Sequence, residues 1–259
     1  MTHHSIKSLA AALFKTPFYK AFINIFLYCP KPIQILRDYV LGSTDYPMEV
    51  RVRTPTGMQK LNLYCYADML TFVECFGKEV YSARGDFDCV VDFGSNIGVS
   101  ALYFLSRNAS SRIYLYEPLG QNIERLKINL NGFEDRYELF QTAVGLENGS
   151  ALFGFEPTGR YGGLKGGSYE GLLKTQKLQG EMEVPVRAAN DILKEILGRH
   201  DRVNILKVDI EGLEDDLLKN LEPSLLDKVD LIYVESEFDG MLKGFRKKIY
   251  GGIARFSGS

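Results

Sequence analysis

Residues 90–98, with the sequence VVDFGSNIG, decide the fold. The short β-branched run at residues 89–91 is typical of a buried parallel strand, and the glycines after it mark a tight turn into a helix at residues 98–105. A second strand at residues 113–116 and a helix at residues 119–130 complete a β-α-β-α unit. This repetition predicts a doubly wound α/β protein with a mainly parallel sheet.

Further strands are expected on the carboxyl side of this unit, at residues 137–142, 203–208 and 229–235. Leucines at helical spacing predict a helix over residues 213–221, between the last two strands. A parallel sheet with helical connections therefore continues through most of the chain.

Two glycine-rich segments interrupt this pattern. Residues 153–169 hold many glycines and show no periodic pattern of apolar residues, so an irregular loop is expected there. This loop is either a lid over a substrate or an ordinary surface loop. Residues 249–254 resemble a tight hairpin around two glycines, so the sheet is expected to end in a short antiparallel pair or the chain to be truncated.

The segment before the main domain lacks this alternation of strand and helix signals. We expect an extension over residues 1–87, followed by the catalytic domain over residues 88–259. Within the extension, strand-like runs flank a Pro-Thr-Gly turn and predict a β-hairpin over residues 48–66, which a helix at residues 68–81 follows. The apolar stretch at residues 9–28 contains lysines and a proline, which favours amphipathic helices; an interfacial membrane anchor is the alternative.

Composition excludes several classes of protein. The chain has 259 residues, 25% of them charged, and a net charge of −2, so no global field favours nucleic acid or an anionic membrane. The four cysteines lack close metal-ligand spacing and are expected to be reduced thiols near the core: Cys29, Cys65, Cys75 and Cys89. Without a secretion signal or a long apolar span, a cytoplasmic location is the default expectation.

The acidic residues near the glycine turn indicate a nucleoside cofactor. Asp92 ends the first strand, and Gly94 and Gly98 allow a ligand to approach the backbone closely. Glu117 ends the second strand, where a carboxylate can accept hydrogen bonds from both hydroxyls of a ribose. Adenosine is therefore expected as part of the cofactor.

Charge separates two candidate cofactors. A dinucleotide would place an anionic pyrophosphate next to Asp92, and the G-x-G-x-x-G signature is missing. S-adenosyl-L-methionine (SAM) instead carries an ammonium and a sulfonium, which a carboxylate stabilises directly or through water. The sequence therefore favours a SAM site, with a purely structural glycine turn as the alternative.

A second group of charged residues follows at residues 207–211. Lys207, Asp209 and Glu211 are spaced by two and would point to one side of a continuing strand, at the edge where open α/β sheets bind ligands. Asp209 is expected to contact the methionine part of the cofactor or the acceptor, and Glu211 to orient the acceptor or act as general base. The alternative is an ion pair between Lys207 and Glu211, with Asp209 capping the next helix.

Other groups were considered for proton removal or metal binding. Glu235 and Glu237 are further candidates for the general base, whereas His200 is expected to be a loop residue. Clustered carboxylates suit a magnesium ion (Mg2+), which is an alternative to the metal-free site that we expect.

These motifs resemble the FkbM family of methyltransferases. The resemblance rests on residues 91–98, 116–118, 143–144 and especially 206–214, LKVDIEGLE, and it covers residues 60–235. It implies a Rossmann-like class I methyltransferase fold, SAM as methyl donor, and O-methylation of a hydroxyl on a sugar, glycan or secondary metabolite. The run AAND at residues 188–191 departs from the family's usual Thr-Leu-Asp, and the carboxyl end is short for a seven-stranded sheet.

The residue patterns and the resemblance to the FkbM family together define the expected site. The expected cofactor-binding residues are Asp92, Gly94, Ser95, Asn96, Gly98, Glu117, Pro118, Gln141, Ala143 and Asp209. The expected catalytic residues are Asp209, Glu211, Lys207 and Glu235. We expect a SAM-dependent O-methyltransferase acting on a small molecule or glycan, with no nucleic-acid partner; a non-catalytic SAM-binding scaffold is the first alternative and a nicotinamide oxidoreductase the second.

Overall fold

The computed structural model describes residues 16–42, 44–82, 87–165, 174, 180–235 and 240–258. The chain divides into two compact units, Met1–Ala83 and Arg84–Ser259. The division predicted from the sequence falls a few residues later, after residue 87.

The amino-terminal unit contains helices around a β-hairpin. Its elements are α2 (Thr16–Tyr28), α3 (Pro32–Leu41), β1 (Met48–Thr54), β2 (Gly57–Leu63), α4 (Tyr66–Phe72) and a π-helical turn, Val73–Lys78. The predicted hairpin is present, but its second strand begins at Gly57 because Thr54 pairs directly with Gly57 across the Pro55-Thr56 turn. Within the described ranges, every helix is too short or too polar to cross a membrane.

The second unit is built on a seven-stranded sheet in the order β12-β13-β11-β10-β3-β4-β5. The strands are β3 (Cys89–Phe93), β4 (Arg112–Tyr116), β5 (Tyr137–Phe140), β10 (Val203–Val208), β11 (Val229–Val234), β12 (Phe245–Tyr250) and β13 (Ile253–Gly258). The neighbours from β11 through β10, β3 and β4 to β5 are parallel, and β13 and β12 are antiparallel. The predicted doubly wound, mainly parallel sheet is thus confirmed.

The carboxyl end differs from one expectation. It was expected to be short for a seven-stranded sheet, and this is wrong, because the predicted Gly-Gly hairpin supplies both β12 and β13. Gly251 and Gly252 form its turn with φ of 62° and 92°, a region that glycine enters without steric cost.

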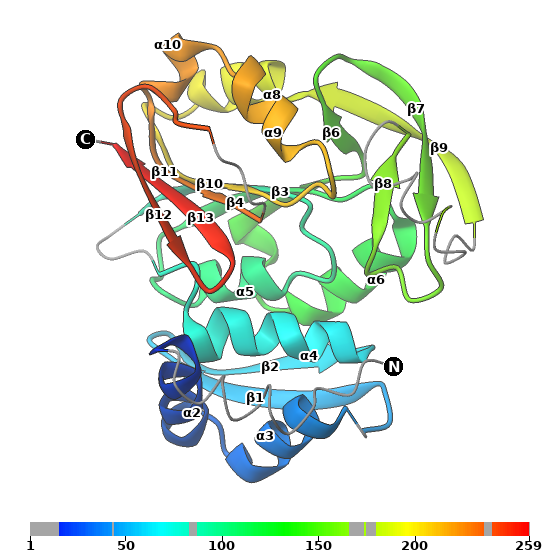
Figure 1. Ribbon diagram of the computed structural model, residues 1–259, viewed down its shortest axis with the longest axis vertical. Helices are drawn as coiled ribbons and strands as arrows, with labels where there is room; N and C mark the ends of the chain where they lie inside the picture. Colours follow the sequence, from blue (N-terminus) through cyan, green and yellow to red (C-terminus); the bar gives the residue numbers. More distant parts are fainter. Residues whose placement is uncertain are drawn as a thin grey trace. The chain divides into compact units, whose positions relative to one another are not determined.

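Helices cover both faces of the central sheet (Figure 1). They are α5 (Val99–Leu105), α6 (Gly120–Asn129), α8 (Ala189–Leu197), α9 (Glu214–Asn220) and α10 (Pro223–Leu226). Side chains from α8, α9 and α10 pack against one face in a single apolar cluster with residues of β3, β10 and β11. These strands are buried on both faces, which explains why their sequences are mainly apolar.

A second, four-stranded sheet replaces the irregular loop that was expected at residues 153–169. Its order is β6-β9-β7-β8, with β6 (Ala143–Gly145), β7 (Gly149–Phe155), β8 (Gly162–Leu164) and β9 (Gly180–Ala188). The expectation is wrong for residues 153–155 and 162–164, where backbone pairing forms a hairpin despite the glycines. Residues 166–169 lie outside the described part of the chain.

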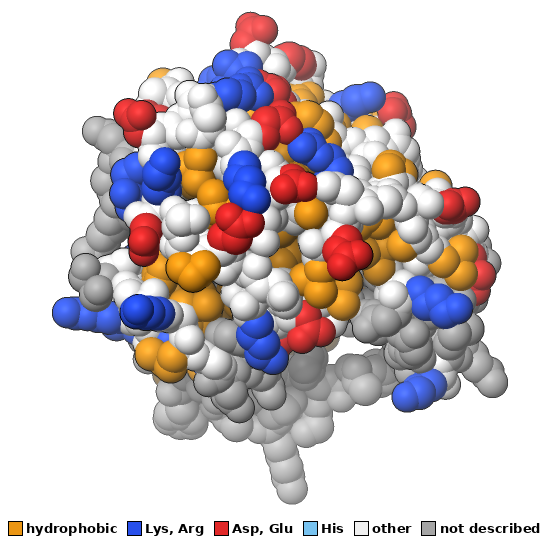
Figure 2. Space-filling model, turned by 90° about the horizontal axis from the view of Figure 1, so that it is seen from above, with side chains coloured by type: hydrophobic (Ala, Val, Ile, Leu, Met, Phe, Trp, Pro, Cys, Tyr) orange, Lys and Arg blue, Asp and Glu red, His pale blue; other side chains and the backbone are white. Residues whose placement is uncertain are grey.

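Charges are mixed on the face shown in Figure 2. Lysine and arginine side chains alternate there with aspartate and glutamate, and apolar patches lie between them. The mixture of positive and negative side chains agrees with the small net charge of the chain, −2.

Candidate functional site

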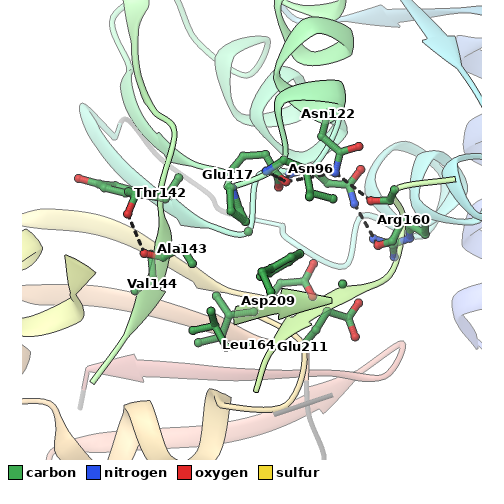
Figure 3. A pocket seen from close by; sticks show the side chains of 18 residues that line it. Asn96, Glu117, Asn122, Thr142, Ala143, Val144, Arg160, Leu164, Asp209 and Glu211 are labelled. Carbon is green, nitrogen blue, oxygen red and sulfur yellow. Dashed lines mark hydrogen bonds between the residues drawn. The ribbon is translucent and has the colours of Figure 1, made fainter. Parts of the chain in front are cut away.

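A pocket lies at the carboxyl edge of β3, β4 and β10, with the β7–β8 hairpin as one wall (Figure 3). Its free space is about 540 Å³ when the part open to solvent is counted. The lining residues are Gly94, Asn96, Tyr116, Glu117, Pro118, Leu119, Asn122, Thr142, Ala143, Val144, Phe153, Gly159, Arg160, Gly162, Leu164, Asp209, Ile210 and Glu211.

The glycine turn is shaped by contacts within the protein. Gly94 has φ of 81°, and a Cβ placed on it would lie 1.8 Å from the carbonyl oxygen of Asp209. Gly98 has φ of 83°, and its Cβ would lie 3.1 Å from the Leu126 side chain. These glycines were expected to allow a ligand to approach the backbone, but their close neighbours are the residue that follows β10 and helix α6.

Glu117 is buried at the end of β4 and holds three hydrogen bonds. Its Oε2 accepts from the Asn96 backbone N–H at 2.9 Å, and its Oε1 accepts from the Leu119 N–H at 3.0 Å and from Asn122 Nδ2 at 3.1 Å. A carboxylate has about four acceptor sites, so about one remains for a ligand in this arrangement. Burial raises the pKa of Glu117 to about 7, although these donors oppose the shift.

Asp92 lies behind the pocket lining, where it is fully buried. It accepts hydrogen bonds from Lys207 Nζ at 3.0 Å and from Ser100 Oγ at 2.7 Å. Register places Lys207 directly beside Asp92 on the neighbouring strands β10 and β3. The structure therefore puts Asp92 in an ion pair, and direct contact with a ligand, as expected from the sequence, would need this pair to open.

Lys207 is also outside the lining, and three oxygens surround its ammonium group. Besides Asp92, these are the Gly94 carbonyl oxygen at 3.0 Å and Asp209 Oδ2 at 3.2 Å. Because an ammonium has three N–H groups, none is left for a substrate. Burial lowers the pKa of Lys207, but the charges of Asp209 and Asp92 outweigh it and raise the pKa, which keeps the ammonium charged.

Two acidic residues after β10 do line the pocket. Burial raises the pKa of Asp209, but the nearby cations Lys207 and Arg160 outweigh it and lower the pKa, so this carboxylate is ionised. Burial and the charge of Asp209 raise the pKa of Glu211 to about 7. Glu211 has φ of 57°, a left-handed conformation that is uncommon outside glycine.

The alternative interpretation of this run is wrong in both parts. Lys207 pairs with Asp92 and Asp209 and not with Glu211. The backbone N–H groups of Ile210 and Gly212 donate to Glu214, at the start of α9, and not to Asp209. Asp209 and Glu211 are therefore left facing the pocket.

The other predicted residues fall into two groups. Asn96, Pro118 and Ala143 line the pocket, whereas Ser95 and Gly98 are buried in the turn and Gln141 is exposed outside the lining. Glu235 follows β11, and its carboxyl group, in the protonated form, donates a hydrogen bond to Asp209 that lowers the pKa of Asp209. Glu237 lies outside the described residues.

His200 lies away from the pocket. Its Nε2 is 2.7 Å from the Tyr114 hydroxyl, across the sheet edge remote from the glycine turn, in keeping with the loop position expected for it.

Sequence reasoning missed several lining residues. Asn122 on α6 donates through Nδ2 to Glu117 and to the Gly159 carbonyl oxygen at 2.8 Å. Thr142 precedes β6, and Arg160 lies between β7 and β8. The position of Asn122 in the predicted helix that follows Glu117 was a signal that the sequence offered. Nothing in the sequence placed the β7–β8 hairpin beside the glycine turn.

Among the residues that the structure describes, no group of three or more His, Cys, Asp or Glu side chains is arranged to hold a metal ion. The four cysteines are free thiols, and three of them are buried.

The parallel sheet, the glycine turn after its first strand and the pocket at its carboxyl edge define a Rossmann-like fold of the class I methyltransferase type. The particular family follows from comparison with known proteins. The methyltransferase FkbM domain matches residues 92–248, more than half of the chain, and the protein belongs to this family.

Relatives carry methyltransferase and biosynthetic names. The chain is 28% identical over 162 residues to Methyltransferase 1 of Beauveria bassiana and 24% identical over 165 residues to 2-O-methyltransferase NoeI of Sinorhizobium fredii; these matches cover 58% and 60% of the chain. It is 27% identical over 224 residues, 72% of the chain, to the AMB antimetabolite synthetase AmbE of Pseudomonas aeruginosa. The matches span 65% of each of the first two proteins and 10% of AmbE.

A solved structure with a similar chain is methyltransferase FkbM of Methylobacillus flagellatus. The superposition covers 74% of this chain and 54% of that one, with 14% identity and a TM-score of 0.46.

Proposed function

We propose that the protein is a SAM-dependent methyltransferase that transfers the methyl group to a hydroxyl of a small molecule or glycan. One observation carries this proposal: a single pocket brings Glu117 and Asp209 together around the glycine turn. The first lies where a ribose is bound in folds of this type, and the second is an ionised group suited to an ammonium.

The two ends of the pocket differ in polarity. Thr142, Ala143 and Val144 lie at the end opposite Arg160 and Glu211 (Figure 3). Apolar side chains of Leu119, Ala143 and Phe153 pack in one cluster at that end, which suits a planar base. The carboxylates and Arg160 at the other end suit the charged amino-acid part of the cofactor.

Each carboxylate then has a distinct role. Glu117 accepts a ribose hydroxyl at its remaining acceptor site and holds the turn through Asn96. Asp209 binds the ammonium, and Lys207 is a positioning residue that fixes Asp209 and the Gly94 carbonyl. SAM supplies an activated methyl group on a sulfonium, so the leaving group needs no acid.

Glu211 is the proposed general base. A hydroxyl acceptor must lose its proton, and a carboxyl group with a pKa of about 7 is suited to accept it near neutral pH. Glu235 supports this end of the site through its hydrogen bond to Asp209. The relative NoeI is named as a 2-O-methyltransferase, which supports oxygen as the methylated atom.

Calorimetric titration with SAM tests the cofactor assignment. We expect the wild-type protein to bind SAM and Glu117→Ala to bind it about 10-fold or more weakly, because a charge-assisted hydrogen bond is lost. The exposed Glu124→Ala on α6 is the matched control and should bind normally. Absence of SAM binding by folded wild-type protein would remove the proposal.

A non-catalytic SAM-binding protein is the competing function. Incubation with SAM and a panel of hydroxyl-bearing acceptors separates the two, since an enzyme releases S-adenosylhomocysteine in an acceptor-dependent manner. Glu211→Gln should bind SAM but lose most of this turnover, by about 100-fold. Equal turnover in Glu211→Gln would remove Glu211 as the base.

A further inference from the structure

Arg160 is a pocket residue whose side chain is incompletely satisfied. It lies in the turn between β7 and β8, is half-buried, and lines the pocket. Its Nε is shielded from solvent and has no hydrogen-bond partner among the described residues. A buried N–H without an acceptor is destabilising because its hydration is lost and not replaced, so an acceptor supplied by a ligand would remove this cost.

Hydrogen bonds hold the backbone of Arg160 against the glycine turn that follows β3. Asn96 Nδ2 donates to the Arg160 carbonyl oxygen at 3.2 Å, and the Arg160 N–H donates to Thr158 Oγ1 at 3.2 Å. Asn122 holds the preceding residue through the Gly159 carbonyl oxygen at 2.8 Å. The base of the side chain is therefore positioned by the same residues that hold Glu117.

The charge around Arg160 indicates what it binds. Burial lowers its pKa, but Asp209, Glu235 and Glu211 outweigh this and raise it, so the guanidinium is a cation. None of the ion pairs within 4.0 Å in the described part of the chain includes Arg160, although Asp209 is near enough to act on its pKa. The pocket lining thus holds the Asp209 carboxylate and the Arg160 guanidinium without a direct ion pair between them, and Asp209 is paired with Lys207 instead.

We propose that Arg160 binds the carboxylate of the methionine part of SAM while Asp209 binds the adjacent ammonium. An α-amino acid carries these two opposite charges on one carbon, so it complements a neighbouring Asp and Arg. The planar guanidinium, with Nε–H and a terminal N–H in a fixed fork, matches a carboxylate in two parallel hydrogen bonds. This inference rests on the proposed function and assigns a cofactor contact to the β7–β8 hairpin.

Paired ligands and paired variants test the inference. Calorimetry compares SAM with decarboxylated SAM, which keeps the ammonium and lacks only the carboxylate. The proteins are the wild type, Arg160→Gln, and Arg246→Gln as a control for the same change at an exposed position on β12. Thermal unfolding of each variant shows whether the fold is kept.

The inference predicts a selective loss. Arg160→Gln should weaken SAM binding about 10- to 100-fold and change the affinity for decarboxylated SAM by less than about 3-fold, with Arg246→Gln unchanged for both ligands. An equal loss for both ligands would assign Arg160 only to holding the pocket wall and would overturn the inference.

Two other outcomes also overturn it, and they differ from each other. If SAM affinity is unchanged in Arg160→Gln while malonate binds the wild type saturated with S-adenosylhomocysteine and not the variant, the anion belongs to the acceptor. If the wild type binds neither SAM nor decarboxylated SAM, the proposed function fails as well.

Discussion

Lys207 is a buried cation held by two carboxylates and one carbonyl oxygen. Lys207→Met would leave Asp92 buried without its cation, so we expect the free energy of unfolding to fall by about 3–5 kcal/mol. Urea unfolding measures this loss. The same change at Lys219, exposed near the end of α9, should alter stability by less than about 0.5 kcal/mol. Similar losses for the two variants would contradict the positioning role.

Gly94 is constrained more tightly than a positive φ alone requires. Gly94→Ala would bring a Cβ to 1.8 Å from the Asp209 carbonyl oxygen, whereas Gly132 has φ of 91° and open space around the added atom. Gly132→Ala should therefore cost about 1–2 kcal/mol, and Gly94→Ala at least about 2 kcal/mol more. Urea unfolding of both variants checks this, and equal costs would show that the approach of β10 is not limiting.

Individual site residues were predictable to different degrees. Glu117 and Asp209 follow strands directly, and Asn96 lies in the turn after β3. Parallel strands bring their carboxyl ends to one edge, so the meeting of these residues in the pocket could be expected. The pairing of Lys207 with Asp92 could not, because it depends on the register of strands far apart in sequence. That pairing explains why Asp92, expected to face the ligand, lies behind the lining.

At the scale of elements, Asn122 joins helix α6 to the β7–β8 hairpin. Asn122→Ala removes one donor to Glu117 and the donor to the Gly159 carbonyl oxygen. We expect faster hydrogen exchange of the amides at residues 156–161 and SAM affinity about 10-fold lower. Asn131→Ala, an exposed change just after the same helix, is the control. Unchanged exchange in Asn122→Ala would mean that the hairpin does not depend on this contact.

The elements of the central sheet were predictable, whereas the second sheet was not. Strands β3, β10 and β11 carry the β-branched apolar runs that burial on both faces requires. Strands β7 and β8 contain glycine, and β7 pairs with β8 on one side and with β9 on the other through backbone contacts that composition does not reveal. For this reason Arg160 was not among the candidate residues.

At the scale of the whole molecule, raised carboxyl pKa values make stability depend on pH. Burial raises the pKa of both Glu117 and Glu211 from 4.5 to about 7, so the folded state binds more protons than the unfolded state between these values. The free energy of unfolding contributed by these groups therefore falls as pH rises from about 4.5 to 7.

Glu211→Gln removes one of these two titrating groups. Between pH 5 and pH 7.5 the wild type should lose about 1–3 kcal/mol more stability than Glu211→Gln, as measured by urea unfolding. The exposed Glu124→Gln should follow the wild type. Parallel stability curves for the wild type and Glu211→Gln would contradict the raised pKa of Glu211.

The central claim is that this pocket binds SAM with its adenosine part at Glu117 and its amino-acid part at Asp209. A crystal structure with S-adenosylhomocysteine tests it most directly. We predict a ribose hydroxyl within hydrogen-bond distance of Glu117, the base beside Leu119 and Ala143, and the ammonium at Asp209. A ligand bound elsewhere, or in this pocket without contact to Glu117 and Asp209, would contradict the claim.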